Sequence, residues 1–237
     1  MRYSPDGDAT LNALDGADRF TDWMFEQVRP WLGGSILEIG SGKGTYGRKV
    51  QRNFPSSRVI LSDIDPGYVA ELRRAFAGSR VEALRIDMEE AADFRQVGGP
   101  VDSAFALNVL EHTRDDGRAL RNVYGALRPG GRFVALVPAH PFLYGAIDRS
   151  IGHTRRYTKR TLLAAVGTTE FKVRRLFYFN ALSLAGWFIA GRILKKTSVS
   201  AGPVNIYIRL IPVMRFLEKR VLRQRVGMSL IAVLEKP

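Results

Sequence analysis

The 237-residue sequence contains no cysteine. The chain can therefore form no disulfide, no thiolate metal site and no cysteine nucleophile, and we expect it to function in a reducing compartment, the cytoplasm. Its first residues lead into no apolar segment of the kind that marks a secretory signal peptide, which supports the same expectation.

A long hydrophobic run is also missing. The most apolar stretch, residues 179–194, is 16 residues long and contains Asn180, Ser183 and Arg192. A membrane-spanning helix needs about 20 predominantly apolar residues, so we predict no transmembrane helix. An amphipathic element that covers the active site, or that lies peripherally on the inner face of the membrane, stays open.

Acidic residues are scarce in the last 99 positions. Residues 139–237 contain 18 Lys and Arg but only 4 Asp and Glu, whereas residues 1–138 are nearly balanced, with 18 against 19. The net charge of +13 therefore arises in the C-terminal part. This asymmetry indicates either an anionic partner (a phosphorylated substrate, a membrane surface or nucleic acid) or a solvated basic face.

What the sequence does contain is an alternation of short apolar runs and amphipathic stretches. Apolar strands separated by helices are typical of a parallel sheet covered on both faces. An opening helix at about 17–32 places Phe20, Met24 and Val28 at helical spacing, and residues 180–227 are expected to form two helices broken around 198–203. The predicted strands are 36–40, 58–63, 81–87, 101–107, 132–138, 171–179 and 228–235, with further helices at about 44–53, 67–77, 89–96, 114–127 and 158–166.

The motif Glu38-x-Gly40-x-Gly42-x-Gly44 lies where the first predicted strand turns into a helix. Glycine there permits positive φ and close approach of a ligand to the backbone, and the helix N-terminus presents free N–H groups. The pattern alone is ambiguous. Gly42, Gly44 and Gly47 also spell the dinucleotide fingerprint G-x-G-x-x-G, with an acid about 20 residues later.

Polar residues also follow the next three predicted strands. Structural roles compete with binding roles at two of these places, because Asp63 and Asp65 can start the turn before Pro66, and Asp87 can cap a helix. The residues and motifs at the strand ends are Asp63 with Ile64, Asp87 with Met88, Asn108 within ALNVLEH (106–112), and LRPGG (127–131) before the fifth strand.

With these motifs the chain resembles the class I S-adenosylmethionine-dependent methyltransferases, in the group that acts on small molecules. The resemblance covers about residues 34–138, and the last strand fits the family's antiparallel seventh. It implies an α/β, Rossmann-like fold, with a seven-stranded, mostly parallel sheet, helices on both faces, and here a helical insertion between the last two strands.

The resemblance also implies S-adenosyl-L-methionine as the cofactor. In this family the glycine turn passes beneath the methionine part, and the acid after strand two binds the ribose. The acid after strand three and its neighbour approach the adenine, and the end of strand four contacts the methionine end. The implied cofactor residues are Glu38, Gly40, Gly42, Gly44, Asp63, Ile64, Asp87, Met88 and Asn108.

We predict a single methyltransferase domain over residues 1–237, with no prediction of its oligomeric state. Its parts are an N-terminal segment and helix (1–33), a cofactor-binding core (34–138), an acceptor loop, helix and strand six (139–179), a basic helical insertion or cap (180–227) and the last strand (228–237).

The three histidines all fall in loops expected at the carboxyl edge of the sheet, where open α/β folds bind ligands. The loop 139–157 resembles a stretch that follows strand five in a bacterial subgroup of these enzymes, and paired arginines suit a carboxylate or phosphate. Alternatively, Asp148 forms a structural ion pair with one of the arginines, and the histidines only hold their loops. The candidates are His140, His153 and Tyr144 for catalysis and His112, Arg155, Arg156 and Tyr157 for acceptor binding.

We therefore predict a methyltransferase that moves a methyl group to an O or N atom of a small molecule, an anionic one being compatible with the basic C-terminal part, by in-line displacement. Positioning alone can supply ~7–11 kcal/mol of the barrier. No metal is expected, because no carboxylate–histidine cluster with metal-ligand spacing is visible in the sequence.

Three competing functions remain compatible with parts of the sequence. A methyltransferase acting on a lipid-linked or glycan intermediate at the membrane surface is one, and an NAD-dependent oxidoreductase is a weaker one. Nucleic acid is the least favoured acceptor, because neither an appended RNA-binding module nor an N-P-P-Y-type motif for a flipped base is present. The membrane-surface function is motivated by Trp187, Phe188, Ile189, Arg209, Arg215, Lys219, Arg220, Arg223 and Arg225.

Overall fold

The computed structural model describes residues 18–181, 183–184, 211–218 and 220–237. The predictions that concern residues 1–17, the apolar Trp187, Phe188 and Ile189, the basic Arg209 and Lys219, and the helix break at 198–203 lie outside the described residues.

The described residues build one seven-stranded sheet with the strand order β3-β2-β1-β4-β5-β7-β6. Strands β1 to β5 run parallel, and β7 lies antiparallel between β5 and β6. This confirms the predicted Rossmann-like, mostly parallel sheet. The strands are β1 (Ile36–Ile39), β2 (Val59–Asp63), β3 (Val81–Arg85), β4 (Val101–Leu107), β5 (Leu127–Pro138), β6 (Lys172–Phe179) and β7 (Ser229–Glu235).

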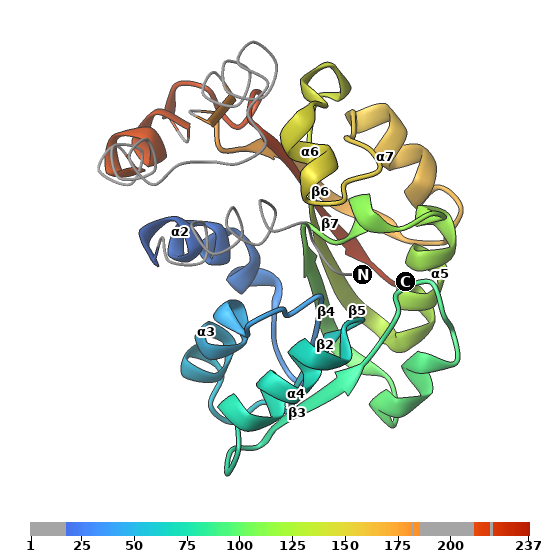
Figure 1. Cartoon of the computed structure of the whole chain (residues 1–237). Helices are drawn as coiled ribbons and strands as arrows, with labels where there is room; N and C mark the ends of the chain where they lie inside the picture. Colours follow the sequence, from blue (N-terminus) through green and yellow to red (C-terminus); the bar gives the residue numbers. More distant parts are fainter. Residues whose placement is uncertain (1–17, 182, 185–210, 219) are drawn as a thin grey trace.

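Helices lie on both sides of the sheet (Figure 1). On one side are α2 (Asp18–Val28), α3 (Thr45–Asn53) and α4 (Pro66–Ala75); on the other are α5 (Asp116–Ala126), α6 (Ala146–Ser150) and α7 (Lys159–Val166). Short 3-10 turns connect them: η1 (Arg29–Trp31), η2 (Asp93–Val97), η3 (Leu110–His112) and η4 (Pro141–Leu143).

Each face of the sheet buries its own apolar core. Leu37 and Ile39 of β1 belong to the core under α5 and α7, whereas Ile36 belongs to the core under α2, α3 and α4. A strand covered on both faces must be apolar nearly throughout, which is why β1 and β2 are almost continuous apolar runs. The exceptions are Glu38, 3% exposed in the middle of β1, and the buried Ser62 and Asp63 at the end of β2.

The parallel strands bring several loops to one edge of the sheet. The carboxyl ends of β1, β2, β4 and β5 all lie there, and β7 begins there, because Ser229 pairs with Pro138. The segments that follow these strands, 40–44, 63–65, 108–112 and 139–157, therefore share this edge, which is the usual ligand-binding edge of such sheets.

The predicted helix at 89–96 is wrong. Residues after β3 form a turn and then η2, and two carboxylates account for it. Asp87 Oδ1 accepts the N–H of Glu89 at 2.9 Å, and Asp93 Oδ2 accepts the N–H of Asp87 at 2.9 Å. Such side-chain to backbone bonds compete with the helical ones.

Two other boundaries differ from the prediction. The opening helix, expected over 17–32, ends at Val28, because Pro30, within the 3-10 turn η1, has no N–H to donate. Phe20, Met24 and Val28 are buried, as their spacing predicts. Strand β5 begins five residues before the expected Arg132, because Leu127 already pairs with Val101 across a register irregularity.

In the described part of the chain, the structure contains no helix with the length and apolar character that a membrane crossing demands. Residues 211–218 of the predicted insertion are helical, in agreement with the prediction for that segment.

Candidate functional site

The glycine turn, residues 40–44, has left-handed backbone at each of its glycines, with φ of 75° at Gly40, 50° at Gly42 and 77° at Gly44. A side chain on Gly40 would clash, because its Cβ would lie 2.3 Å from Val109 Cγ2. Beside Gly42, by contrast, no described atom outside Gly42 and its two chain neighbours lies within 4 Å of the Cβ position. The turn therefore presents bare backbone to an open space, as a ligand cradle requires.

Asp63, the last residue of β2, is tied directly to this turn. Its side chain is 8% exposed, and its Oδ2 accepts the N–H of Gly42 at 2.9 Å, while Oδ1 accepts the N–H of Asp65 at 2.9 Å. Burial raises the pKa of the Asp63 carboxyl, and the two backbone donors partly offset that effect. The turn and Asp63 thus form one unit.

The neighbouring acid has a different role. Asp65 is the N-cap of α4 and accepts the N–H of Gly67 at 2.7 Å, so the structural role that the sequence allowed for both acids applies to Asp65. Between the two acids, Ile64 exposes 41% of its surface. An exposed isoleucine beside a buried carboxylate offers an apolar face and a polar anchor at the same strand end.

The remaining predicted cofactor residues lie along the same edge with unequal exposure. Met88 is buried in the core under α5, and Asp87 is half-buried with its Oδ1 on the N–H of Glu89. Asn108 is exposed and has φ of 55°, an unusual backbone for a residue other than glycine. Their roles toward a cofactor stay predictions.

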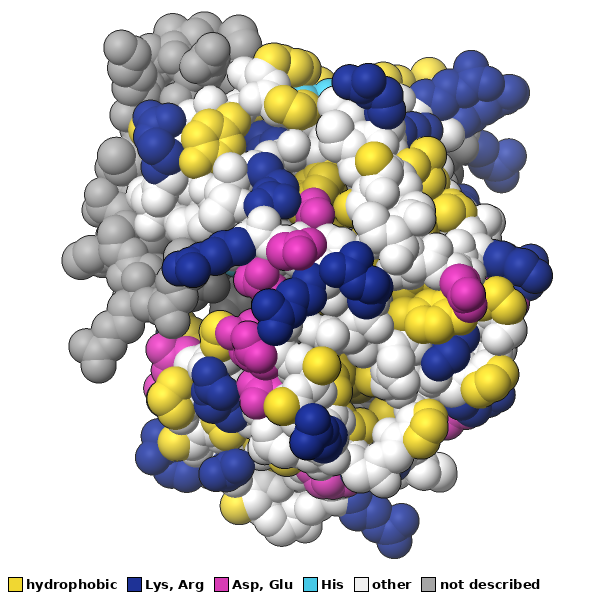
Figure 2. Space-filling model, turned by 90° about the vertical axis from the view of Figure 1, so that its right-hand side faces the viewer, with side chains coloured by type: hydrophobic (Ala, Val, Ile, Leu, Met, Phe, Trp, Pro, Cys, Tyr) yellow, Lys and Arg dark blue, Asp and Glu magenta, His cyan; other side chains and the backbone are white. Residues whose placement is uncertain are grey.

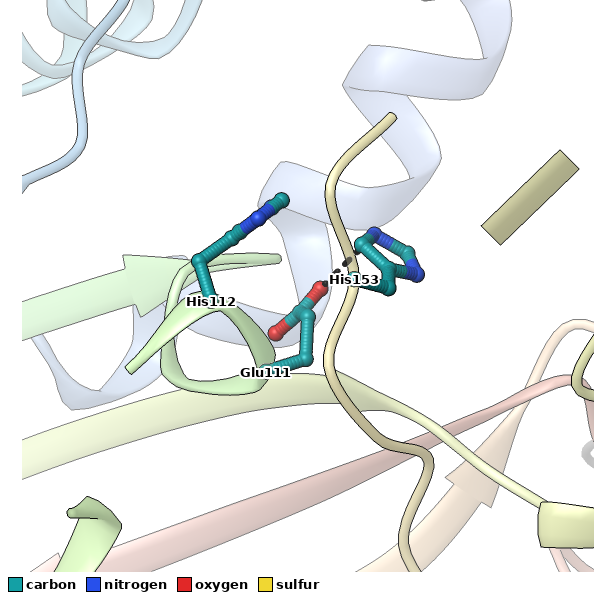
Figure 3. Close-up of side chains that lie close together, drawn as sticks. All are labelled: Glu111, His112 and His153. Carbon is teal, nitrogen blue, oxygen red and sulfur yellow. Dashed lines mark ion pairs between the residues drawn. The ribbon is translucent and has the colours of Figure 1, made fainter. Parts of the chain in front are cut away.

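The loop 139–157 encloses a buried cluster made of Glu111, Asp148, His153 and Arg156. Asp148 and Glu111 have fully buried side chains, and Arg156 is 5% exposed. Asp148 Oδ1 accepts from His153 Nδ1 at 2.9 Å and from Arg156 Nε at 2.8 Å, and its Oδ2 accepts the N–H of Gly145 at 3.0 Å. His153 Nε2 lies 3.5 Å from Glu111 Oε1 (Figure 3).

Burial dominates the electrostatics of this cluster. It raises the pKa of the Glu111 carboxyl to about 7, against the lowering effect of His153 and Arg156. Burial also lowers the pKa of the adjacent His112 to about 4, with help from His153. For Asp148, burial acts to raise the pKa, but the hydrogen bond from His153 and the charge of Arg156 outweigh it, and the pKa is lowered.

The predicted acceptor residues are held by internal contacts. Arg156 pairs with Asp148, which is one of the two structural ion pairs that the sequence allows, and Arg155 Nη1 instead lies 3.1 Å from Asp116 Oδ2. Tyr157 donates its hydroxyl to the same Asp116 oxygen at 3.0 Å. These contacts attach the loop to η3 and α5, so direct acceptor binding by these three side chains stays a prediction without support from the geometry.

The candidate catalytic residues do not form one group. Tyr144 donates its hydroxyl to the His153 carbonyl at 2.9 Å, and the rings of His112 and His153 lie 4.9 Å apart. His140 has other neighbours: its Nε2 lies 3.0 Å from the Gly227 carbonyl oxygen, and its ring stacks on Tyr178 at 5.2 Å.

Two residues beside His140 were not predicted from the sequence. Tyr178, at the end of β6, carries the stacked ring, and Lys159 Nζ lies 5.0 Å from the centre of that ring. No local pattern marks either residue, because β6, α7 and the segment that follows β5 come together only in the folded chain. His140, Lys159 and Tyr178 are all half-buried and so remain reachable from solvent.

Comparison with known proteins gives a consistent result. Residues 37–133 match a family model described as a methyltransferase domain. The chain is 28% identical over 124 residues to the ubiquinone biosynthesis O-methyltransferase of Aeromonas salmonicida, which covers 52% of this chain and 51% of that protein. It is 25% identical over 186 residues to the ribosomal RNA small subunit methyltransferase C of Pseudomonas aeruginosa. That alignment covers 74% of this chain and 54% of that protein.

A solved S-adenosylmethionine-dependent methyltransferase from Mesorhizobium loti has the same fold, with a TM-score of 0.60, 18% identity, and coverage of 94% of this chain and 100% of that one. The chain spans about half the length of the curated relatives it matches. The match to the methyltransferase domain extends from β1 into β5, across the glycine turn and Asp63. Residues 37–133 are thus similar to a methyltransferase domain, and the described fold is that of a solved S-adenosylmethionine-dependent methyltransferase.

Proposed function

We propose that this chain is an active methyltransferase that moves a methyl group from S-adenosyl-L-methionine to an oxygen or nitrogen atom of a small molecule. One observation carries the proposal: the open space beside Gly42, where bare backbone and the buried Asp63 carboxylate meet at the carboxyl edge of the sheet. That edge is where open α/β folds bind their ligands.

The residues at this edge suit the cofactor. Each oxygen of Asp63 takes one backbone N–H, and a carboxylate has about four acceptor positions, so both oxygens can also accept from ribose hydroxyls. Ile64 offers exposed apolar surface for the adenine. The positive φ values at Gly40, Gly42 and Gly44 favour glycine, so these three positions place no side chain in the cradle.

When bound, S-adenosyl-L-methionine supplies a methyl group that is already electrophilic. The chain then has to hold the acceptor in line with that methyl group and exclude water, and such positioning can supply ~7–11 kcal/mol of the barrier. An acceptor hydroxyl or amine must in addition lose a proton.

His140 is the residue we favour for taking that proton. The Gly227 carbonyl oxygen can only accept a hydrogen bond, so Nε2 carries the proton and Nδ1 presents a lone pair. Burial lowers the pKa of the His140 ring, which keeps it neutral near pH 7 and able to act as a base. A positioned base contributes about 10²–10⁴-fold.

An anionic acceptor, if that is the substrate, would meet Lys159 rather than the predicted arginines. Arg155 and Arg156 are already paired with Asp116 and Asp148. Lys159 lies over Tyr178, whose ring stacks on His140, so a cation, an aromatic ring and a base candidate lie side by side.

The test uses the full chain and methyl-labelled S-adenosyl-L-methionine, with a cell extract separated into small-molecule, lipid and RNA fractions. We expect label in the small-molecule fraction together with S-adenosylhomocysteine. Label only in RNA or only in lipid would overturn the acceptor class, and a chain that neither binds S-adenosylhomocysteine nor transfers label would overturn the function.

The same assay tests His140. His140→Ala should keep affinity for S-adenosylhomocysteine within about twofold and lower turnover by about 10² or more. Unchanged turnover would remove His140 from the mechanism.

A specific observation favours a second candidate, methylation of a lipid-linked or glycan intermediate at the membrane surface. Val213, Phe216 and Val221, within or next to the helical residues 211–218, are 57%, 62% and 63% exposed. Arg220, Arg223 and Arg225 lie next to them in the chain and are also exposed. Exposed apolar residues beside basic ones suit an anionic membrane surface. Cosedimentation with phosphatidylserine vesicles that Phe216→Ser abolishes would support this candidate, and indifference to vesicles would exclude it.

The oxidoreductase and nucleic-acid functions are less well supported. A dinucleotide-binding fold usually has the strand order 3-2-1-4-5-6, whereas here the antiparallel β7 lies between β5 and β6. On the face shown in Figure 2, the Lys and Arg side chains are spread out and interleaved with Asp and Glu rather than gathered into one basic stripe. That face therefore lacks the usual electrostatic footprint of a nucleic-acid site.

A further inference from the structure

Three side chains with metal-binding atoms converge beside η3. Glu111 and His112 come from η3 itself, and His153 comes from the loop after α6 (Figure 3). One potential ligand atom from each of the three lies within 4.8 Å of the others. We call Glu111, His112 and His153 the donor triad.

The hydrogen bonds around the two histidines orient their lone pairs. His153 Nδ1 lies 2.9 Å from Asp148 Oδ1, and that carboxylate is paired with Arg156 and accepts. His112 Nδ1 lies 3.0 Å from the Gly152 carbonyl oxygen, which also accepts. Both Nδ1 atoms therefore carry a proton, and in the neutral imidazole both Nε2 atoms present lone pairs. A carboxylate or carbonyl behind an imidazole is the usual support of a metal-binding histidine.

Glu111 supplies the strongest reason for an ion. Its side chain is fully buried, and neither carboxylate oxygen accepts a hydrogen bond from any described residue. Its Oε1 lies 3.5 Å from His153 Nε2. A buried carboxylate facing another acceptor is unfavourable unless something positive lies between them. Arg156 contributes charge nearby but already donates to Asp148.

We propose that the donor triad binds one divalent first-row transition-metal ion through a carboxylate oxygen of Glu111 and the Nε2 atoms of His112 and His153. Two imidazoles and one carboxylate are a common ligand set for such ions and leave coordination positions open. Metal–ligand bonds of about 2.0–2.2 Å place donors roughly 3–3.5 Å apart, so the donor atoms, which lie within 4.8 Å of one another, have to move closer together when they bind the ion.

The location connects this site to the proposed function. Val109, directly before η3, is the residue that a Cβ on Gly40 would strike, so the donor triad adjoins the cofactor cradle. An open coordination position there suits an acceptor oxygen, which a metal ion orients and makes easier to deprotonate. That consequence rests on the proposed methyl transfer, whereas metal binding itself does not.

The test begins with the full chain freed of metal by chelation. Cobalt(II), manganese(II) and zinc(II) are titrated in separate calorimetric experiments, and cobalt(II) is also followed by visible absorption. We expect one ion per chain and a cobalt spectrum typical of nitrogen and oxygen ligands. Glu111→Gln and His112→Gln should each weaken binding by more than the 10–100-fold that loss of a supporting residue causes.

The chain provides its own matched control in His140, the third histidine, which lies outside the donor triad. His140→Gln should bind the ion within about twofold of the parent chain, and circular dichroism should show every variant folded. His153→Gln tests the third ligand, although loss of its bond to Asp148 can affect folding, so Glu111→Gln and His112→Gln decide the matter.

Two results would overturn the inference. In the first, the folded parent chain binds none of the three ions at one per chain. A proton, rather than a metal ion, would then lie between Glu111 and His153. The other is equal binding by the parent, Glu111→Gln and His112→Gln. S-adenosylhomocysteine binding, measured on the same samples, separates the two proposals: a chain that binds the ion but not S-adenosylhomocysteine would refute the proposed function alone.

Discussion

The glycine turn and the buried cluster lie at the same edge of the sheet, yet they are built in opposite ways. The turn uses backbone N–H groups and missing side chains within residues 40–44, joined to one carboxylate at the next strand end. The cluster uses charged side chains that come from η3 and from a loop about 40 residues later. The glycine turn remains folded with open space beside it, whereas each buried charge of the cluster is stable only while its partners are present. The two regions should therefore fail differently when altered.

The largest effect is expected in the buried cluster. Arg156→Met replaces the guanidinium with an apolar side chain of similar length and leaves Asp148 and Glu111 without their cation. Breaking a buried ion pair in this way lowers the free energy of unfolding by about 3–5 kcal/mol. Urea unfolding at neutral pH measures it. Arg155→Met is the control, because its guanidinium is 33% exposed on Asp116, and we expect about 1 kcal/mol or less. Equal losses would show that the cluster is no different from a surface ion pair.

The glycine turn should fail in binding rather than in folding. Gly42→Val places a β-branched side chain in the open space and should weaken S-adenosylhomocysteine binding by about 100-fold or more, which is roughly 2.8 kcal/mol. Gly78→Val is matched to it, since Gly78 also has positive φ, at 76°, and open space at its Cβ position, but follows α4 at the opposite edge of the sheet. In both variants, valine at positive φ costs about 1–2 kcal/mol of backbone strain. Only Gly42→Val should lose S-adenosylhomocysteine binding, as measured by calorimetry.

The two acids after β2 sharpen the distinction further. Asp63→Asn removes a charge from the cradle and should weaken S-adenosylhomocysteine binding by about 10–100-fold, because hydrogen bonds to charged groups contribute about 1.5–3 kcal/mol. Asp65→Asn should change neither affinity nor stability noticeably, because asparagine caps helices as well as aspartate. If Asp65→Asn has the larger effect on affinity, the assignment of the ribose carboxylate is wrong.

The smallest effect is expected far from both regions, at the start of β4. Asp102 Oδ2 accepts the N–H and the hydroxyl of Ser35, each at 2.7 Å, and Asp102 also pairs with Arg128. These bonds hold the pKa of Asp102 at about 2, below its usual 3.8. Asp102→Asn should cost about 1 kcal/mol at neutral pH, because solvent screens this partly exposed group.

The pH dependence of that variant has a definite sign. A lowered pKa stabilises the folded state above pH 3.8 and loses this contribution as the pH falls toward 2. The difference between parent and Asp102→Asn, measured by urea midpoints, should therefore shrink between pH 5 and pH 2. A difference that grows over this range would contradict the assigned cause.

Most of the fold could be predicted from the sequence, because its signals are local. The seven strands and the glycine turn follow from apolar runs and from the glycines at positions 40, 42 and 44, whereas the antiparallel direction of the last strand was implied by the family resemblance. Local competition also explains the failures: Asp87 and Asp93 bond to backbone N–H groups and prevent the helix expected at 89–96. Asp63 was distinguishable as a strand-end carboxylate, but only the structure separates its role from that of Asp65.

The sequence by itself determined the sheet and the position of the glycine turn at its edge, since hydrophobic periodicity and glycine placement act over a few residues. Only the tertiary structure decided what the histidines, arginines and acids of the loop 139–157 do. Glu111 and His112 are adjacent in sequence, but His153 reaches them from 41 positions further along, and no metal-ligand spacing announces that meeting. The physical reason is that buried charges are placed by partners across the fold, whereas a strand or a glycine turn is placed mainly by its own residues.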